Sequence, residues 1–371
     1  MATRPARVLV VDDSAVVRES LRAELLTREG IGAVETAADG ATALRKVERF
    51  DPDVVTMDVE MPGLDGLATL RRLMAQAPRP VIMLSAHTTA GAARTIRALE
   101  IGAVDFIEKP TAQSGHDLRV VVSDLCSKIH VLCGRWRGRR PRAGARLSAP
   151  ALPQGRLPEG GAAQTVVAIG ASTGGTEAIR EVLEELPRDL PAGILVVQHM
   201  PAGFTLAFAN RLDQLCALEV KEARHRDVIR PGRVLVAAGD HHLLVRRDGN
   251  TPFVELSRKP RVNGHRPSVD VTMHAAADVF GSRTVGVLLT GMGKDGAGGM
   301  QRIQEAGGRT MAQDEESSVV FGMPKAAIDL GVVDEIQSLA AIGSSVCRAV
   351  RGLEDEGRSA WRTRAEEATD G

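Results

Sequence analysis

The sequence predicts an α/β protein of two domains, each built on a doubly wound or mostly parallel β-sheet. Short apolar runs that are typical of buried strands alternate with amphipathic helical segments in both halves of the chain. A stretch rich in Arg, Gly, Pro and Ala at residues 134–163 interrupts this alternation. In both halves, polar side chains directly follow apolar runs. These side chains therefore lie at the carboxyl ends of strands, where open parallel sheets bind ligands.

Length and composition agree with a globular protein of two or three domains. The chain has 371 residues, of which 43% are hydrophobic and 25% are charged. The formal net charge is zero, so there is no overall attraction to nucleic acid or to a membrane surface. The four cysteines form no CxxC pair, which suits a reducing compartment. Since no apolar run is long enough for a signal peptide or a membrane span, we expect a cytoplasmic protein that neither inserts into membranes nor binds nucleic acid.

Residues 1–133 are predicted to form the first domain, a (βα)5 doubly wound unit. The predicted strands are residues 8–11, 34–37, 54–57, 81–84 and 104–107. The predicted helices lie near residues 15–28, 41–49, 67–76, 90–100 and 117–132. The strand ends carry acidic, hydroxyl and basic side chains, namely Asp12, Asp13, Asp58, Ser85 and Lys109.

The acidic residues at these strand ends predict a cation site. Carboxylates gathered at one edge repel one another, and a hard divalent cation with oxygen ligands relieves that repulsion. Asp12 and Asp13 taken alone are equally well explained as caps of the following helix. Asp58 and Lys109 end other strands, however, and this favours a shared site in which Lys109 and Ser85 hold an anionic group added to Asp58.

The first domain resembles the receiver domains of two-component response regulators. The matching stretches are VVDD at 10–13, MDVEMPGLDG at 57–66, LSA at 84–86 and FIEKP at 106–110. The resemblance implies that Asp58 is the phosphoacceptor and that Ser85 and Lys109 contact the phosphoryl group. It also implies a switch role for Phe106 and a Mg²⁺ site for phosphorylation. The implied metal ligands are Asp12, Asp13, Asp58 and the backbone carbonyl of Glu60.

Two segments lack the hydrophobic periodicity of folded domains. Residues 134–163 are predicted to form a flexible Arg/Gly/Pro-rich linker. The arginines around Trp136 also suit a nucleic-acid-binding arm, but the composition favours a solvated linker. Residues 353–371 are strongly charged and are predicted to form a disordered tail.

Residues 164–352 are predicted to form the second domain, in which Ser172 stands at a strand-to-helix turn. An apolar run at 166–169 is followed by Gly-Ala-Ser-Thr-Gly-Gly and then by helical periodicity over 177–186. The pattern Gly170-x-Ser172-x-Gly174 matches the nucleophile elbow of α/β-hydrolases, but such a short pattern is common in turns. It leaves two interpretations open, a nucleophile or a helix cap.

Two further residues are predicted to lie at the same sheet edge as Ser172. His199 follows the apolar run 193–197, which is about one βαβ unit later in the chain. Asp295 lies in a glycine-rich loop after the predicted strand 284–289. It suits either an N-cap of the helix 297–305 or a partner of His199 in a Ser-His-Asp triad. The order Ser, His, Asp differs from that of α/β-hydrolases, which indicates a separate fold. Ser268 and Asp270 are predicted to cap and open a helix at 271–280.

The second domain resembles the catalytic domain of the CheB family of chemotaxis protein-glutamate methylesterases. The matching stretches are AIGASTGG (168–175), QHMP (198–201), RPSVDV (266–271), LTGMGKDGAGG (289–299) and FGMPKAA (321–327). The resemblance implies hydrolysis of glutamate methyl esters, and deamidation of glutamines, on the cytoplasmic helices of methyl-accepting chemoreceptors. Ser172 is then the nucleophile, His199 the base and Asp295 its orienting acid. Backbone N–H groups near Thr173 and at Met292 stabilise the oxyanion.

The same resemblance implies how the enzyme is regulated. A chemotaxis histidine kinase donates the phosphoryl group to Asp58, and phosphorylation relieves an inhibition of the esterase by the receiver domain, giving receptor adaptation. No cofactor is expected for the esterase step, and we expect a monomer.

Two other functions compete with this interpretation. A receiver fused to a DNA-binding output predicts a compact, basic helix-turn-helix domain, whereas the second domain shows strands and glycine-rich loops. A scaffold that has lost catalysis predicts a broken triad, whereas Ser172, His199 and Asp295 are all present.

Overall fold

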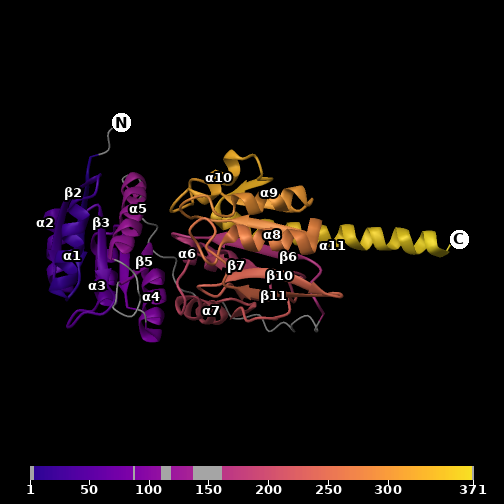
Figure 1. Ribbon diagram of the computed structural model, residues 1–371, viewed down its shortest axis with the longest axis horizontal. Coiled ribbons are helices and arrows are strands. Elements are labelled where there is room, and N and C mark those ends of the chain that lie inside the picture. The colour runs from indigo at the N-terminus through magenta and orange to yellow at the C-terminus, as the bar shows by residue number, and fades with distance from the viewer. Residues whose placement is uncertain (1–3, 87, 110–117, 137–160, 370–371) are drawn as a thin grey trace. The chain divides into compact units, whose positions relative to one another are not determined.

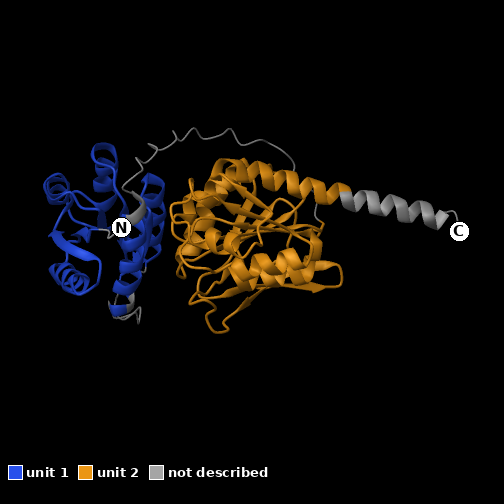
Figure 2. Ribbon diagram, turned by 90° about the horizontal axis from the view of Figure 1, so that it is seen from above, with its two compact units in different colours: residues 1–148 blue, residues 149–371 orange. Residues whose placement is uncertain are grey.

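The computed structural model describes residues 4–86, 88–109, 118–136 and 161–369. The chain divides into two compact units, Met1–Ser148 and Ala149–Gly371 (Figure 2). Most of the predicted linker, residues 137–160, lies outside the described residues. Each unit is built around its own β-sheet, as the sequence predicts (Figure 1).

The first unit has a five-stranded sheet in which all neighbouring strands are parallel. Every residue of its third and fourth strands is buried, because helices cover both faces. This confirms the predicted (βα)5 arrangement. In spatial order the strands are β2 (Ile31–Ala37), β1 (Ala6–Val11), β3 (Val54–Asp58), β4 (Val81–Ser85) and β5 (Asp105–Glu108). The helices are α1 (Ala15–Leu26), α2 (Gly40–Phe50), α3 (Gly66–Gln76), α4 (Thr89–Ile101) and α5 (Leu118–Trp136).

The second unit has a seven-stranded sheet, also with parallel neighbours throughout, and a separate antiparallel hairpin. This confirms the predicted mostly parallel sheet. In spatial order the strands are β14 (Glu335–Gln337), β13 (Arg309–Gln313), β12 (Thr284–Leu288), β6 (Val166–Ala171), β7 (Gly193–Gln198), β9 (Arg233–Val236) and β8 (Glu219–Glu222). The hairpin consists of β10 (His242–Asp248) and β11 (Thr251–Ser257).

Helices of the second unit pack in two groups. Helix α6 (Gly175–Glu185) contacts α7 (Phe204–Leu215) and α11 (Leu339–Thr369). Helix α9 (Ala297–Glu305) contacts α8 (Val269–Phe280) and α10 (Met323–Asp329), and α8 also packs on β6 and on the β10–β11 hairpin. A short 3₁₀ turn, η1 (Gly281–Arg283), leads from α8 into β12.

The order of strands in the second unit brings three connections together. Strand β6 lies between β12 and β7, with Leu288 paired to Gly170 and Ala171 paired to Gln198. The chain segments that follow these three strands therefore meet at one edge of the sheet. Gly170 lets α8 approach this edge, because a Cβ atom there would collide with Val269.

The C-terminal segment differs from its predicted structure. Helix α11 continues to Thr369, whereas the sequence predicts a disordered tail from residue 353. The helix is anchored by its buried first part, including Val346, Val350 and Leu353. Residues 353–369 are rich in Glu, Arg and Ala, which favour propagation of a helix once it is nucleated. Within the described residues, no helix is long and apolar enough to cross a membrane.

Candidate active site

Ser172 lies in the turn between β6 and α6 and does not cap the helix. The N-cap of α6 is Gly174, with a φ of 77°, and the helix begins at Gly175. The Ser172 N–H donates to the carbonyl of Thr290 (3.0 Å), and its own carbonyl accepts from Gly175 N–H (2.8 Å). The helix-cap interpretation of Ser172 is therefore wrong, and the half-buried hydroxyl is left for another task.

Two close contacts fix the backbone around Ser172. The side-chain amide of Gln198 donates to the carbonyls of Ser172 (2.9 Å) and His199 (3.3 Å). On the other side lies Gly291, where a Cβ atom would be only 2.9 Å from the Cβ of Ser172. The loop after β12 therefore packs directly against the serine turn, and only a glycine fits there.

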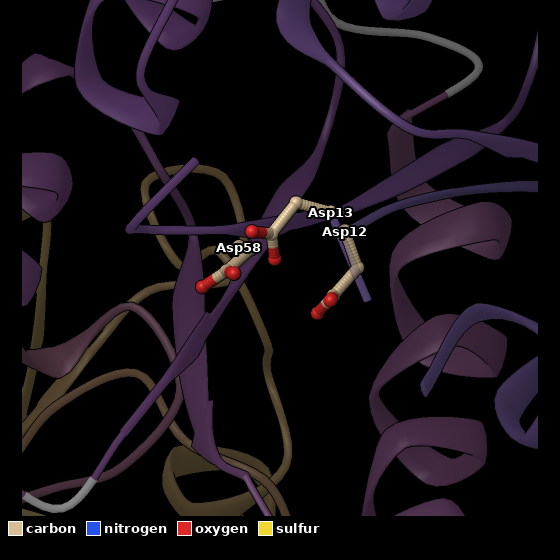
Figure 3. Close-up of side chains that lie close together, drawn as sticks. All are labelled: Asp12, Asp13 and Asp58. Atoms are coloured by element: carbon tan, nitrogen blue, oxygen red, sulfur yellow. The ribbon is translucent and has the colours of Figure 1, made fainter. Parts of the chain in front are cut away.

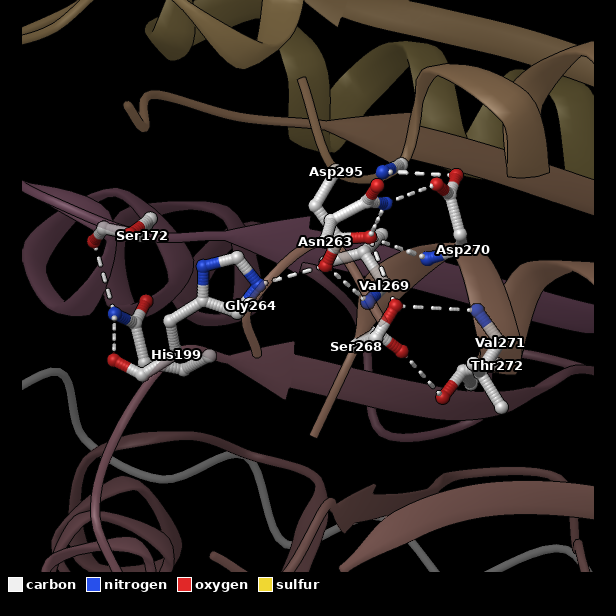
Figure 4. A network of polar contacts seen from close by, with 12 residues as sticks. Ser172, His199, Asn263, Gly264, Ser268, Val269, Asp270, Val271, Thr272 and Asp295 are labelled. Atoms are coloured by element: carbon white, nitrogen blue, oxygen red, sulfur yellow. Dashed lines mark hydrogen bonds and ion pairs between the residues drawn. The ribbon is translucent and has the colours of Figure 1, made fainter. Parts of the chain in front are cut away.

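The structure brings His199 and Asp295 together as the sequence predicts. Their side chains are 6% and 1% exposed, and Nε2 of His199 lies 2.8 Å from Oδ2 of Asp295. Figure 4 shows the imidazole ring between Ser172 and Asp295. The other ring nitrogen, Nδ1, is buried and has no hydrogen-bond partner among the described residues. A proton on Nε2 would leave Nδ1 as the basic nitrogen of the ring.

Asp295 accepts five hydrogen bonds from described residues and does not cap α9, whose N-cap is Gly296. Burial alone raises the pKa of the Asp295 carboxyl, but the hydrogen bond and charge of His199, with further donors, hold it well below its usual range. The donors are His199 Nε2 (2.8 Å), Asn263 Nδ2 (2.9 Å), Ser268 Oγ (2.8 Å), Val269 N–H (2.7 Å) and Asp270 N–H (3.2 Å).

Ser268 and Asp270 have the predicted cap and first-turn positions and also a second role. Ser268 is the N-cap of α8, with its Oγ accepting from Val271 N–H, and the same hydroxyl donates to Asp295. Asp270 lies in the first turn of α8 and accepts from Gly296 N–H (2.9 Å) and Gly299 N–H (2.7 Å) at the start of α9. The sequence interpretation missed that these residues join the hydrogen-bond network around Asp295.

Asn263 and His265 are the other residues that the sequence interpretation missed. Asn263 donates to both Asp270 (2.6 Å) and Asp295, and the ring of His265 stacks on that of His199. The Asn-Gly dipeptide at 263–264 is a turn signal in the sequence. It indicates where the chain reverses but not which residues the turn will face.

The predicted oxyanion residues, Thr173 and Met292, lie in the serine turn and in the loop after β12. Thr173 follows Ser172 in the turn, and its carbonyl accepts from Thr290 Oγ1 (3.0 Å). Met292 follows Gly291, the position in the loop after β12 at which an added Cβ atom would meet Ser172.

At the carboxyl edge of the first sheet, Asp12, Asp13 and Asp58 form one acidic cluster (Figure 3). One carboxylate oxygen from each lies within 4.8 Å of the others. Helix α1 is capped by Ser14, and Asp12 accepts from the Ser14 N–H (2.9 Å). The interpretation of Asp12 and Asp13 as caps of α1 is therefore wrong, and oxygen ligands at this spacing suit a divalent cation.

Lys109 reaches this cluster from the end of β5. Its Nζ lies 2.6 Å from Oδ2 of Asp12 and 2.7 Å from Oδ2 of Asp58. Burial raises the pKa of Asp58, and the hydrogen bond and charge of Lys109 only partly oppose this. Burial acts to lower the pKa of Lys109, but the hydrogen bonds and charges of Asp12 and Asp58 have the larger effect, so the pKa of Lys109 is raised overall.

The remaining predicted receiver residues surround Asp58. The Glu60 N–H donates to Asp58 Oδ1 (3.2 Å), and the Glu60 side chain is exposed. Ser85 ends β4, where its buried Oγ accepts from Thr95 Oγ1 (2.8 Å) on α4. Phe106 is buried on β5.

Comparisons with known proteins match both units to described families. The family model of the CheB methylesterase matches residues 167–346, and that of the response regulator receiver domain matches residues 8–120. Both matches fall inside the domains that the sequence predicts.

Curated relatives match this chain across both units. A protein-glutamate methylesterase/protein-glutamine glutaminase of Syntrophotalea carbinolica is 48% identical over 337 residues, covering 90% of this chain and 94% of the relative. One of Anaeromyxobacter dehalogenans is 48% identical over 357 residues, covering 94% and 98%. A solved structure, the catalytic domain of Thermotoga maritima CheB methylesterase, is 41% identical and covers 50% of this chain and 97% of that one, with a TM-score of 0.49. The chain belongs to the CheB methylesterase family of chemotaxis response regulators, with a receiver domain preceding the methylesterase domain.

Proposed function

We propose that this protein is a serine-type protein-glutamate methylesterase and glutamine deamidase whose triad is Ser172, His199 and Asp295. The observation that carries the proposal is the buried 2.8 Å contact between His199 and Asp295 beside the Ser172 turn. The relatives named as methylesterase/glutaminase support the substrate class. A scaffold without catalysis would have no need to hold these three side chains in this order.

The proposed reaction begins with attack of Ser172 Oγ on the ester carbonyl while Nδ1 of His199 takes the hydroxyl proton. Asp295, held as an anion, stabilises the imidazolium through Nε2. Backbone N–H groups near Thr173 and at Met292 stabilise the negative charge that develops on the carbonyl oxygen. His199 then protonates the departing methanol, and water, activated by the same base, releases the carboxylate.

Deamidation follows the same steps with a different leaving group. For a glutamine side chain, His199 protonates the departing nitrogen, and ammonia leaves in place of methanol. Both reactions end in a glutamate carboxylate and a regenerated Ser172. We propose methyl-accepting chemoreceptors as the substrates, because the chain belongs to a chemotaxis family.

The first domain, residues 1–133, supplies regulation in this proposal. Asp58 accepts a phosphoryl group from a histidine kinase, and Lys109 and Ser85 hold the added group. Asp12, Asp13, Asp58 and the Glu60 carbonyl would hold Mg²⁺, whose charge offsets the oxygens gathered at the site. The acidic cluster supports this assignment. In this proposal the receiver domain spans residues 1–133, the methylesterase domain spans residues 164–352, and a linker joins them.

Replacing the proposed nucleophile tests the triad. Ser172→Ala is expected to lower methanol release from methylated receptor membranes by about a million-fold, as in other triads. Ser344→Ala, which removes an exposed hydroxyl on α11, is the matched control and should keep normal activity. Near-normal turnover by folded Ser172→Ala protein would reject the serine mechanism.

A further inference from the structure

Residues 262–265 form a two-residue hairpin turn that contacts both the acid and the base of the proposed triad. The backbone N–H of Val262 donates to the carbonyl of His265 (3.1 Å), and the reverse bond is 2.9 Å. The two central residues, Asn263 and Gly264, have φ angles of 53° and 82°. Asn-Gly is the residue pair that such turns favour, because both positions need a positive φ. The turn is thus conformationally defined by its own sequence.

The side chain of Asn263 joins two carboxylates. Its Nδ2 donates to Asp270 Oδ2 (2.6 Å) and to Asp295 Oδ1 (2.9 Å), so each hydrogen of the amide group has an acceptor (Figure 4). Burial raises the pKa of Asp270, backbone hydrogen bonding opposes this, and the charge of Asp295 raises it further. The amide therefore lies between the carboxylates of Asp270 and Asp295. It holds Oδ1 of Asp295, whereas His199 contacts Oδ2.

His265 contacts the base of the triad. Its ring lies 3.7 Å from the ring of His199, centroid to centroid, with an angle of 8° between the planes. A flat ring held against one face restricts rotation of His199 about χ2. Rotation of that ring would separate Nε2 from Asp295 and turn Nδ1 away from Ser172.

We propose that the 262–265 turn is the positioning element of the triad, with Asn263 orienting Asp295 and His265 orienting the ring of His199. The inference rests on the proposed triad and assigns neither residue a role in bond making. One short segment thereby sets the direction of the acid and the plane of the base together. The distance and angle between the side chains of His199 and Asp295 are then maintained only if the turn keeps its shape.

Two substitutions at Asn263 distinguish the effect of its side-chain amide from the effect of its backbone conformation. Asn263→Gly keeps the positive φ and removes the amide, while Asn263→Asp keeps the size and places a third carboxylate beside Asp270 and Asp295. Asn263→Gly is expected to lower kcat about 10- to 100-fold, the range for losing a hydrogen bond to a charged group, with little change in KM. Asn263→Asp is expected to move the acidic limb of the kcat/KM profile to higher pH, because added negative charge stabilises the imidazolium of His199.

The stacking partner is tested by a second pair. His265→Phe keeps a flat ring against His199 and should retain most activity, whereas His265→Ala should lose about tenfold in kcat. The ionisable groups of this network are His199, His265, Asp270 and Asp295, so the phenylalanine variant also shows whether the second imidazole contributes to the pH profile.

Matched controls come from exposed residues of the same types in the same unit. Asn250→Gly and Asn250→Asp alter the turn between β10 and β11, and His274→Ala alters an exposed position of α8. All rates are measured as methanol release from methylated receptor membranes and divided by the folded fraction from circular dichroism. The controls should match the parent protein.

The outcomes distinguish this inference from the proposed function. If Ser172→Ala is inactive while the Asn263 and His265 variants have normal kcat and an unmoved acidic limb, the positioning role is rejected and the triad stands. If Ser172→Ala is active, the proposed triad fails. Reduced kcat per folded molecule in Asn263→Gly, a shifted limb in Asn263→Asp and retained activity in His265→Phe together support the inference.

Discussion

Both sheets place a carboxylate beside a basic side chain at their carboxyl edge, yet the pKa values of the two carboxylates shift in opposite directions. Asp295 lies 2.8 Å from His199, and Asp58 lies 2.7 Å from Lys109. The pKa of Asp295 is lowered and that of Asp58 is raised, although burial opposes ionisation at both. Contact with a basic side chain therefore does not by itself determine whether the pKa of a carboxylate is raised or lowered.

The difference follows from the other neighbours. Asp295 accepts four hydrogen bonds besides that of His199, two of them from backbone N–H groups at the start of α8. Asp58 has a backbone donor in Glu60 and faces Asp12, whose charge opposes its ionisation. The ionised form of Asp295 is thus stabilised by several hydrogen-bond donors, which suits a residue that stays an anion. Asp58 has fewer donors, which suits its proposed roles of binding a cation and accepting a phosphoryl group.

Of the changes at these two carboxylates, the largest effect is expected from removing the negative charge of Asp295. Asp295→Asn should lower kcat for methanol release by about 10⁴-fold, as an uncharged partner favours the wrong tautomer in other triads. Asp278→Asn, at an exposed site on α8, is the control. A loss of less than tenfold in folded protein would mean that the charge of Asp295 does not support His199.

A smaller effect is expected for Mg²⁺ at the first sheet. Asp13→Asn removes the charge of one proposed ligand and should weaken Mg²⁺ binding by about tenfold, equivalent to about 1.4 kcal/mol. Isothermal titration calorimetry on the full chain measures this, with Glu19→Gln on the exposed face of α1 as the control. EDTA should abolish phosphorylation by a small phosphodonor. Equal Mg²⁺ affinity in both variants would remove Asp13 from the site.

The smallest effect concerns stability and has a defined sign. A raised pKa means that folded Asp58 holds its proton more tightly than the unfolded chain does. Ionised Asp58 therefore destabilises the first unit at neutral pH, and this cost disappears as the pH falls to the unfolded value of about 3.9. Asp58→Asn should raise the thermal unfolding temperature at pH 7 without added Mg²⁺.

The matching measurement at the other sheet should give the opposite sign. The lowered pKa of Asp295 means that its ionised form stabilises the fold above the unfolded pKa, and that this stability is lost as the pH falls through the folded pKa. Asp295→Asn should therefore lower the unfolding temperature at pH 7. Shifts of the same sign in the two variants would contradict the comparison.

The sequence was sufficient for the residues that follow strands. Ser172, His199, Asp58 and Lys109 each come at or just after an apolar run. Within each sheet, parallel pairing places the ends of its strands at one edge, so Asp58 and Lys109 share an edge of the first sheet and Ser172 and His199 share an edge of the second. The order of strands in each sheet decides which of these strand ends lie next to one another. This information lies in long-range packing, such as the position of β6 between β12 and β7.

The roles of Asn263, His265 and Asp270 were not predictable in the same way. Their local patterns indicate a turn and a helix start, which many exposed segments share. Their contacts with Asp295 and His199 depend on how α8 packs against β6. Val269 of α8 can approach β6 there because Gly170 has no side chain. The helix α11 was missed because its charged end follows a buried part, and the composition of the end alone does not show that anchor.

The close approach of Gly291 to Ser172 limits how this enzyme can be altered. A methyl group at position 291 would meet the sulfur of Met323, whose side chain is buried, and the Cβ and backbone nitrogen of Ser172. The turn of Ser172, the proposed nucleophile, and the loop that bears Met292 are therefore packed tightly together. We therefore expect new substrate preferences to arise from side chains around the serine turn rather than from substitution of Gly291.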